Sequence, residues 1–179
     1  MALRVLSSAA VTAADLPMAG LAARMRMPDG WVTVPDMALR LESQLQSALA
    51  ATERRLGRVL LRRQVTLGGT ADGGSSIALP ARPVEALVSV EVDRGAGFEA
   101  VSGARLVEER IELPAPLRVG CAVNVVVEAG HGAWADVPAD LAQVVLLIAE
   151  RGESGDGTLE PLIERTIAPF RTLRLGRRI

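Results

Sequence analysis

The longest helical pattern in the chain runs from Val34 to Arg58. Its apolar positions recur at spacings of three and four residues, which places them in one stripe along an α-helix: Met37, Leu41, Leu45, Ala48, Leu49, Thr52 and Leu56. Pro35 suits the first turn because it has no N–H to lose and its φ is already helical. Gly57 tolerates the left-handed conformation that ends many helices. We predict a helix of roughly 22 residues, about 33 Å long, with one face to bury.

Weaker helical patterns lie near both ends of the chain. After a weakly structured lead-in over residues 1–14, residues 16–27 predict a short helix. Residues 138–149 are apolar nearly all round, so this helix should be buried on more than one side, in its own domain or against another subunit. Our candidates for subunit contact on it are Leu141, Val144, Leu146 and Leu147. A last helix should begin at a Thr158 cap and carry an apolar stripe from Leu159 to Phe170.

Between these helices the apolar period changes from about 3.6 to 2, which is typical of half-buried strands. Alternation predicts five or six short strands near residues 61–67, 77–79, 88–92, 98–101, 111–113 and 122–129. The fold class is therefore α+β, a bundle of about four helices with an antiparallel sheet or small sandwich inserted between the long second helix and the third. The expected divisions are 1–59 (N-terminal helices), 60–130 (β-rich insertion), 131–170 (C-terminal helices) and 171–179 (basic tail).

Composition favours a folded protein, with 49% hydrophobic residues and a net charge of −1. A near-neutral charge gives no global nucleic-acid footprint, so any contact with DNA has to be local. All 20 basic residues are arginine and tyrosine is absent, which we interpret mainly as a high-GC coding bias, with selection for guanidinium contacts as the alternative. The single cysteine, Cys121, cannot form an internal disulfide and is compatible with a reducing cytoplasm. Neither a signal peptide nor a transmembrane segment is expected.

Catalytic chemistry has little support in the sequence. His131 is the only histidine, and no G-x-S-x-G elbow or similar nucleophile context accompanies it. One histidine and one cysteine ten residues apart cannot complete a tetrahedral metal site. The glycine-rich segment 68–76 cannot be a P-loop, because the chain has no lysine. We therefore expect no enzyme, no metal and no cofactor.

Two arginine groups are candidate binding features. The first follows the end of the long helix and would face a phosphate backbone if many copies lined a channel, although a solvated helix face is the simpler interpretation: Arg54, Arg55, Arg58, Arg62 and Arg63. The second lies in the C-terminal segment, where arginines alternate with aliphatic residues after an anchoring phenylalanine: Phe170, Arg171, Leu173, Arg174, Leu175, Arg177, Arg178 and Ile179. That mixture suits docking on a partner, since no acidic residue lies nearby in sequence, but a frayed terminus has the same pattern.

The order of these features resembles a known family. Four stretches carry the likeness: ATERRLGRVLLRRQ at the end of the long helix, IALPARPVEALVSVEV in the β region, VVVEAGHGAWADVPADLAQVVLLIAE leading into the third helix, and LEPLIERTIAPFR near the end. Together they extend over roughly residues 15–173, and the chain is identified as similar to the head–tail connector, or adaptor, proteins of long-tailed bacteriophages and gene transfer agents.

The resemblance implies a structural, non-enzymatic subunit of a ring, typically of twelve copies, that sits beneath the portal protein and continues the DNA channel toward the tail. The implied partners are the portal protein, a stopper or tail-completion protein, other copies of the chain, and double-stranded DNA that passes without sequence specificity. The implied location is the head–tail junction of a virion or gene transfer agent particle assembled in the bacterial cytoplasm. The alternatives are a stopper or tail-terminator ring protein of the same particle, and a small DNA-associated binding module.

Overall fold

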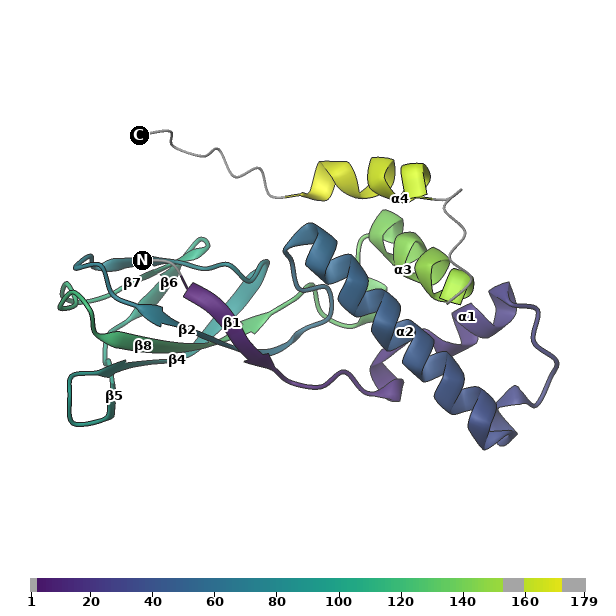
Figure 1. The fold of residues 1–179 in the computed structure, drawn as a ribbon, viewed down its shortest axis with the longest axis horizontal. Helices are drawn as coiled ribbons and strands as arrows, with labels where there is room; N and C mark the ends of the chain where they lie inside the picture. Colours follow the sequence, from purple (N-terminus) through teal and green to yellow (C-terminus); the bar gives the residue numbers. More distant parts are fainter. Residues whose placement is uncertain (1–2, 153–159, 172–179) are drawn as a thin grey trace. The chain divides into compact units, whose positions relative to one another are not determined.

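The computed structural model describes residues 3–152 and 160–171, and the chain forms two compact units. One unit, here the sheet unit, contains Met1–Ala10 and Arg58–Gly132. The other, the helical unit, contains Val11–Gly57 and Ala133–Ile179. The chain therefore passes from one unit to the other three times, and we describe each unit by itself (Figure 1).

The sheet unit contains two antiparallel sheets. The larger has the strand order β1-β2-β8-β4-β5, with β1 at Leu3–Ser8, β2 at Arg63–Thr70, β8 at Ala122–Ala129, β4 at Val84–Asp93 and β5 at Phe98–Ala100. The smaller has the order β3-β7-β6, with β3 at Ser76–Ala78, β7 at Arg110–Glu112 and β6 at Arg105–Val107. The central strand β8 pairs with β2 and β4, both of which lie far before it in the sequence, so this sheet is built from non-local pairings.

The core of the sheet unit follows from the alternation of side chains along β8. Val123, Val125 and Val127 are fully buried, whereas the residues between them are only half-buried. Since side chains of a strand alternate between faces, one face of β8 lies in the core. Ile77 and Ile111 of the smaller sheet are also fully buried and belong to the same core cluster.

The helical unit contains four α-helices: α1 at Met18–Arg24, α2 at Pro35–Leu56, α3 at Ala139–Arg151 and α4 at Glu160–Ile167. Short 3-10 turns precede or follow them: η1 at Ala13–Asp15, η2 at Trp31–Thr33, η3 at Trp134–Asp136 and η6 at Ala168–Phe170. α2 packs against both α1 and α3, and α3 packs against α4. α3 also packs against α1, so α2 and α3 together form the centre of this unit.

The predicted stripe of α2 is the face that the unit buries. Six of its seven members are at most 3% exposed, and Met37, in the first turn, is 38% exposed. The buried hydroxyl of Thr52 donates to the Ala48 carbonyl at 2.8 Å, so this polar side chain is satisfied within its own helix. Gly57 ends the helix with φ 65°, the left-handed conformation that the sequence predicted.

The predicted fold class is confirmed, because the chain contains four helices and antiparallel sheets whose strands, except β1, lie between α2 and α3 in the sequence. One local prediction was wrong, and one strand was missed. Residues 1–14 are not a weakly structured lead-in, since Leu3–Ser8 form β1 and pair with β2. β6 was not predicted, yet it pairs with β7 across a tight turn in which Glu108 has φ 54°. Thr158, the expected cap of the last helix, lies outside the described residues.

A backbone crossing closes the sheet unit where the chain enters and leaves it. The N–H of His131 donates to the Leu60 carbonyl at 2.9 Å, and the N–H of Arg62 donates to the Gly132 carbonyl at 2.9 Å. Gly130 has φ 120°, and a Cβ placed on it would lie 2.4 Å from the carbonyl carbon and oxygen of Leu61. Only glycine allows so close an approach between two backbones.

We expect Gly130→Ala to destabilise the protein by about 3 kcal/mol or more, because backbone strain and a steric conflict add. The matched control is Gly95→Ala. Gly95 has a similar φ of 105° but open space around it, so strain alone should cost about 1–2 kcal/mol. Chemical denaturation of the two variants measures the difference. Equal losses of stability in the two variants would contradict this, because they would show that the two backbones move apart enough to accommodate a methyl group at no extra cost.

Candidate functional site

The five arginines in the last turn of α2 and just after it are divided between the two units. Arg54 and Arg55 belong to the last turn of α2 in the helical unit, whereas the other three belong to the sheet unit: Arg58, Arg62 and Arg63. The sequence placed them together because they are close along the chain. The structure instead gives each a separate environment.

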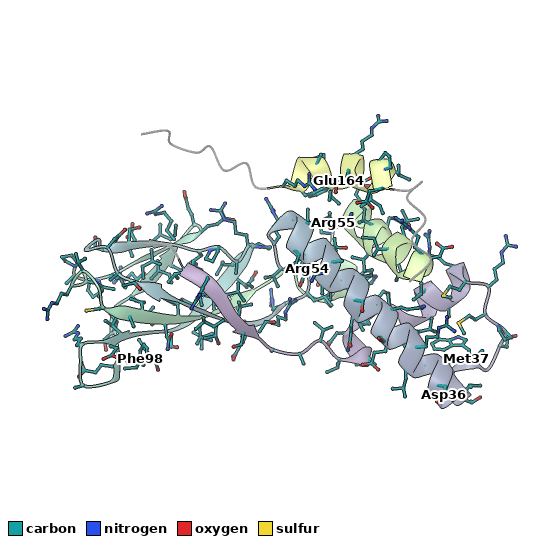
Figure 2. All side chains as sticks on the ribbon, in the orientation of Figure 1. Asp36, Met37, Arg54, Arg55, Phe98 and Glu164 are labelled. Carbon is teal, nitrogen blue, oxygen red and sulfur yellow. The ribbon has the colours of Figure 1, made fainter. Side chains whose placement is uncertain are left out.

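Arg55 is paired with the carboxylates of α4. Its guanidinium lies 2.7 Å from Glu160 and 3.7 Å from Glu164 (Figure 2). Arg151 of α3 lies 3.6 Å from Glu160, so the two acidic residues accept cations from two helices. Arg54 is exposed, and no ion pair joins it to any residue that the structure describes. Among the described residues, the positive charge of Arg54 is therefore less neutralised than that of Arg55.

Two of the three arginines in the sheet unit also have local partners. Arg62 forms an ion pair with Glu85 at 3.2 Å, and Arg63 donates to the Leu61 carbonyl at 3.2 Å. Arg62 and Glu85 are both about half exposed, so this ion pair adds little to stability. Its effect is to place an acidic residue beside one of the arginines that we predicted to face DNA.

His131 lies half-buried in the glycine-flanked loop after β8. Burial lowers the pKa of its imidazole from the ordinary value near 6.5, and the positive charge of Arg58 lowers it further. The side chain therefore resists protonation near neutral pH. Within residues 3–152 and 160–171, no group of three or more histidine, cysteine, aspartate or glutamate side chains could hold a metal ion.

Most of the apolar surface of α3 is buried within the helical unit. Leu141 and Val144 are at most 1% exposed, Leu146 is 9% exposed and Leu147 is half-buried. The proposed contact with another subunit stays a prediction. If this helix contributes to it, Leu146 and Leu147 are the two candidates with exposed surface.

The C-terminal segment begins at an anchored point. Ile163 and Ile167 of α4 are fully buried, and Phe170 in the following turn is half-buried. Arg171 lies 2.6 Å from Glu164, so the expectation that it lacks an internal acid was wrong. Residues 172–179, which include the other predicted portal-binding residues, lie outside the described part: Leu173, Arg174, Leu175, Arg177, Arg178 and Ile179.

Glu160 and Glu164 are the residues that sequence reasoning missed. Together they bind arginines from α2, α3 and the segment after α4. Their spacing of four, which puts both on one face of a helix, was an available signal. Their partners could not be predicted from the sequence, because the arginines come from distant parts of the chain.

In the described part no helix is long and apolar enough to cross a membrane.

Comparison with known proteins defines the class. No family model matches the chain, and no curated protein matches it. A chain in the neck of an empty gene transfer agent particle, computed with C6 symmetry, is 29% identical with a TM-score of 0.83. A chain in the virion of a native gene transfer agent particle is 29% identical with a TM-score of 0.79. Each alignment covers 99% of both chains.

A third chain, from the neck of a native gene transfer agent particle computed with C12 symmetry, is 30% identical over 99% of both chains, with a TM-score of 0.78. The class of protein that this fold defines is a structural protein of the particle neck. Our sequence belongs to the same family as these neck proteins of gene transfer agents.

We expect Arg55→Met to lower the free energy of unfolding by about 1 kcal/mol, because it removes two partly exposed ion pairs. The loss should shrink as salt is added, since partly exposed pairs are screened. Arg54→Met, on the same helical turn, should change stability by less than about 0.5 kcal/mol. Denaturation of both variants at low and high salt tests this, and equal effects would argue against the pairing.

His131 should make stability depend on pH. The folded pKa is lowered, so the unfolded chain binds the proton more readily, and stability should fall as pH drops below about 6.5. The loss should level off below the folded pKa. His131→Gln should remove this component, so the difference between denaturation curves of the two proteins at several pH values isolates it. A difference that does not vary between pH 7 and pH 5 would contradict the assignment.

Proposed function

We propose that this chain is a head–tail connector (adaptor) subunit that forms a ring beneath the portal, extends the DNA channel and provides the platform for tail attachment. The observation that carries the proposal is the match over 99% of the chain to proteins of gene transfer agent necks. A subunit with this role needs binding surfaces rather than a reactive centre, in keeping with the structural class of the family.

The ring is proposed to contain twelve copies. Support comes from the C12 symmetry used for the neck that holds one similar chain, and C6 symmetry is compatible with the same number. Leu146 and Leu147 of α3 are candidates for contact between neighbouring copies, because they retain some exposure beside a buried core.

The portal protein is the proposed partner of the segment from Phe170 to Ile179. The described start of this segment supports the proposal, because Phe170 and the pair of Arg171 with Glu164 fix the point from which it leaves α4. A segment held at one end loses less freedom on binding than a fully free chain. A stopper or tail-completion protein would bind the opposite side of the ring.

DNA is proposed to pass the arginines without sequence-specific contact. Repetition around a ring multiplies a modest local charge, and too strong an attraction would hinder DNA exit. The ion pairs of Arg55 and Arg62 with glutamates moderate that charge. Arg54 is the member of the group that we expect to contribute most, because it is exposed and has no ion-pair partner among the described residues.

Assembly is proposed to occur in the bacterial cytoplasm, and the ring would then remain at the head–tail junction of the particle.

The proposal is tested in a producing cell whose own copy of the gene is deleted. Without the chain, we expect DNA-filled heads that lack tails, because the platform for tail attachment is absent. Heads that fail to fill would instead favour an earlier role in packaging. Free heads and free tails, with this chain bound to the tails, would favour a tail terminator. A monomer that binds DNA with a steep salt dependence and never joins a particle would favour the binding module.

Deleting residues 172–179 should reduce the fraction of filled heads that carry tails, because the chain would bind the portal more weakly. A full-length variant with Leu173, Leu175 and Ile179 replaced by serine tests whether apolar contact, rather than length, is responsible. Electron microscopy counts the tails, and the amount of chain bound to purified portal gives the occupancy. Normal values of both for the deletion would mean that the segment is only a frayed end.

A further inference from the structure

The five-stranded sheet ends in two strands that pair on one side only within the described residues. β1 pairs with β2, and β5 pairs with β4. Five of the six residues of β1 and all three residues of β5 are exposed. Unpaired backbone groups along an exposed edge are a template for another strand.

The two edges carry exposed apolar side chains. Val5 and Leu6 of β1 are 53% and 51% exposed, and Phe98 at the start of β5 is 48% exposed (Figure 2). Phe98 is one of only two phenylalanines in the chain. An aromatic side chain half in solvent at a strand edge gains most from a partner that covers it.

The edges also differ in charge on the same face of the sheet. The register places Arg4 of β1 in one row with Gly68, Asn124, Glu91 and Ala100, and directly paired residues share a face. The next row on the same face pairs Asp93 of β4 with Phe98 of β5. This face is therefore basic at the β1 edge and acidic at the β4–β5 edge.

The β4–β5 edge is held in place by its own turn. One carboxylate oxygen of Asp93 accepts from the N–H groups of Gly95, at 2.8 Å, and Gly97, at 3.2 Å. These bonds fix the turn that presents Phe98 and β5. A preformed edge loses little conformational entropy when a second strand joins it.

We propose that β1 of one copy pairs with β5 of the next copy, so that neighbouring subunits of the ring share a continuous sheet. The inference rests on the proposed ring. The strand that pairs with each edge should come from a second copy of the chain. The reason is that the complementary edge, which is opposite in charge and also apolar, is on the same molecule. A contact between two different patches is heterologous, and heterologous contacts are those that close into rings.

The geometry agrees with rotation about a ring axis. Four antiparallel pairings separate β1 from β5, so the two strands run in the same direction. One twelfth of a turn about an axis along the strands hardly changes strand direction, and the pairing between copies is then parallel. β1 keeps a regular register with β2 over Leu3–Val5, and the register shifts between Val5 and Ser7. The regular part of β1 is therefore three residues long, the same length as β5. The short length limits uncontrolled pairing of free subunits.

Cysteine cross-linking tests the pairing. In a Cys121→Ser background, Arg4→Cys and Ala100→Cys are combined in the full chain, and particles or portal-bound assemblies are oxidised mildly. We expect a ladder of covalent multimers on non-reducing gels, at least about tenfold stronger than with either single variant, since pairing brings the two positions within disulfide reach. Phe98→Cys in place of Ala100→Cys covers a two-residue shift in register. The matched control combines Arg4→Cys with Val119→Cys, because Val119 is 71% exposed but lies on neither edge.

A second variant does not depend on disulfide geometry. Arg4→Glu should weaken each contact by up to about fivefold, because it would put an acidic residue against the acidic edge. Rings seen by electron microscopy without a ladder in either cysteine pair, and unaffected by Arg4→Glu, would overturn the sheet pairing and leave the proposed function intact. A parent chain that forms no ring even on the portal would overturn both.

Discussion

The sheet unit depends on the contact between two backbones, where Gly130–Gly132 crosses Leu60–Arg62. Two hydrogen bonds join these segments, and a third runs from the Gly130 N–H to the Pro83 carbonyl at 2.9 Å. Leu60–Arg62 leads into β2 and Gly130–Gly132 follows β8, and these two strands are neighbours in the sheet. The crossing therefore continues the β2–β8 pairing to the points where the chain enters and leaves the unit. A long insertion is tolerated there because both of its ends are held side by side.

The helical unit depends in turn on how α4 is attached. Only two of its residues, Ile163 and Ile167, are fully buried, so apolar packing alone holds it modestly. The ion pairs of Glu160 and Glu164 with Arg55, Arg151 and Arg171 add polar links to α2, α3 and the segment after α4. In the connector that we propose, this helix would give the C-terminal segment a defined starting point. Arg55, one of the arginines predicted to face DNA, thus has a structural role within this unit.

The sequence predicted elements where a local pattern was long. The stripe of α2 and the alternation of β8 both persist over two or more turns or pleats, and both match the structure closely. β1 was missed because Leu3-Arg4-Val5 is too short an alternation to stand out, and its strand conformation comes from pairing with β2, sixty residues away. The same limit applies to the site. Arg55 and Glu160 meet only in the folded chain, whereas the family resemblance needed no contacts because it depends on the order of features along the sequence.

Above all, we propose that this chain is a ring subunit of a particle neck. The most direct measurement is an electron cryomicroscopy reconstruction, without imposed symmetry, of the neck of particles assembled with this chain. We predict a single ring of twelve copies between the portal and the rest of the neck, each with the two units described above. Particles whose head–tail junction contains no copy of the chain, or a single copy outside any ring, would contradict the account.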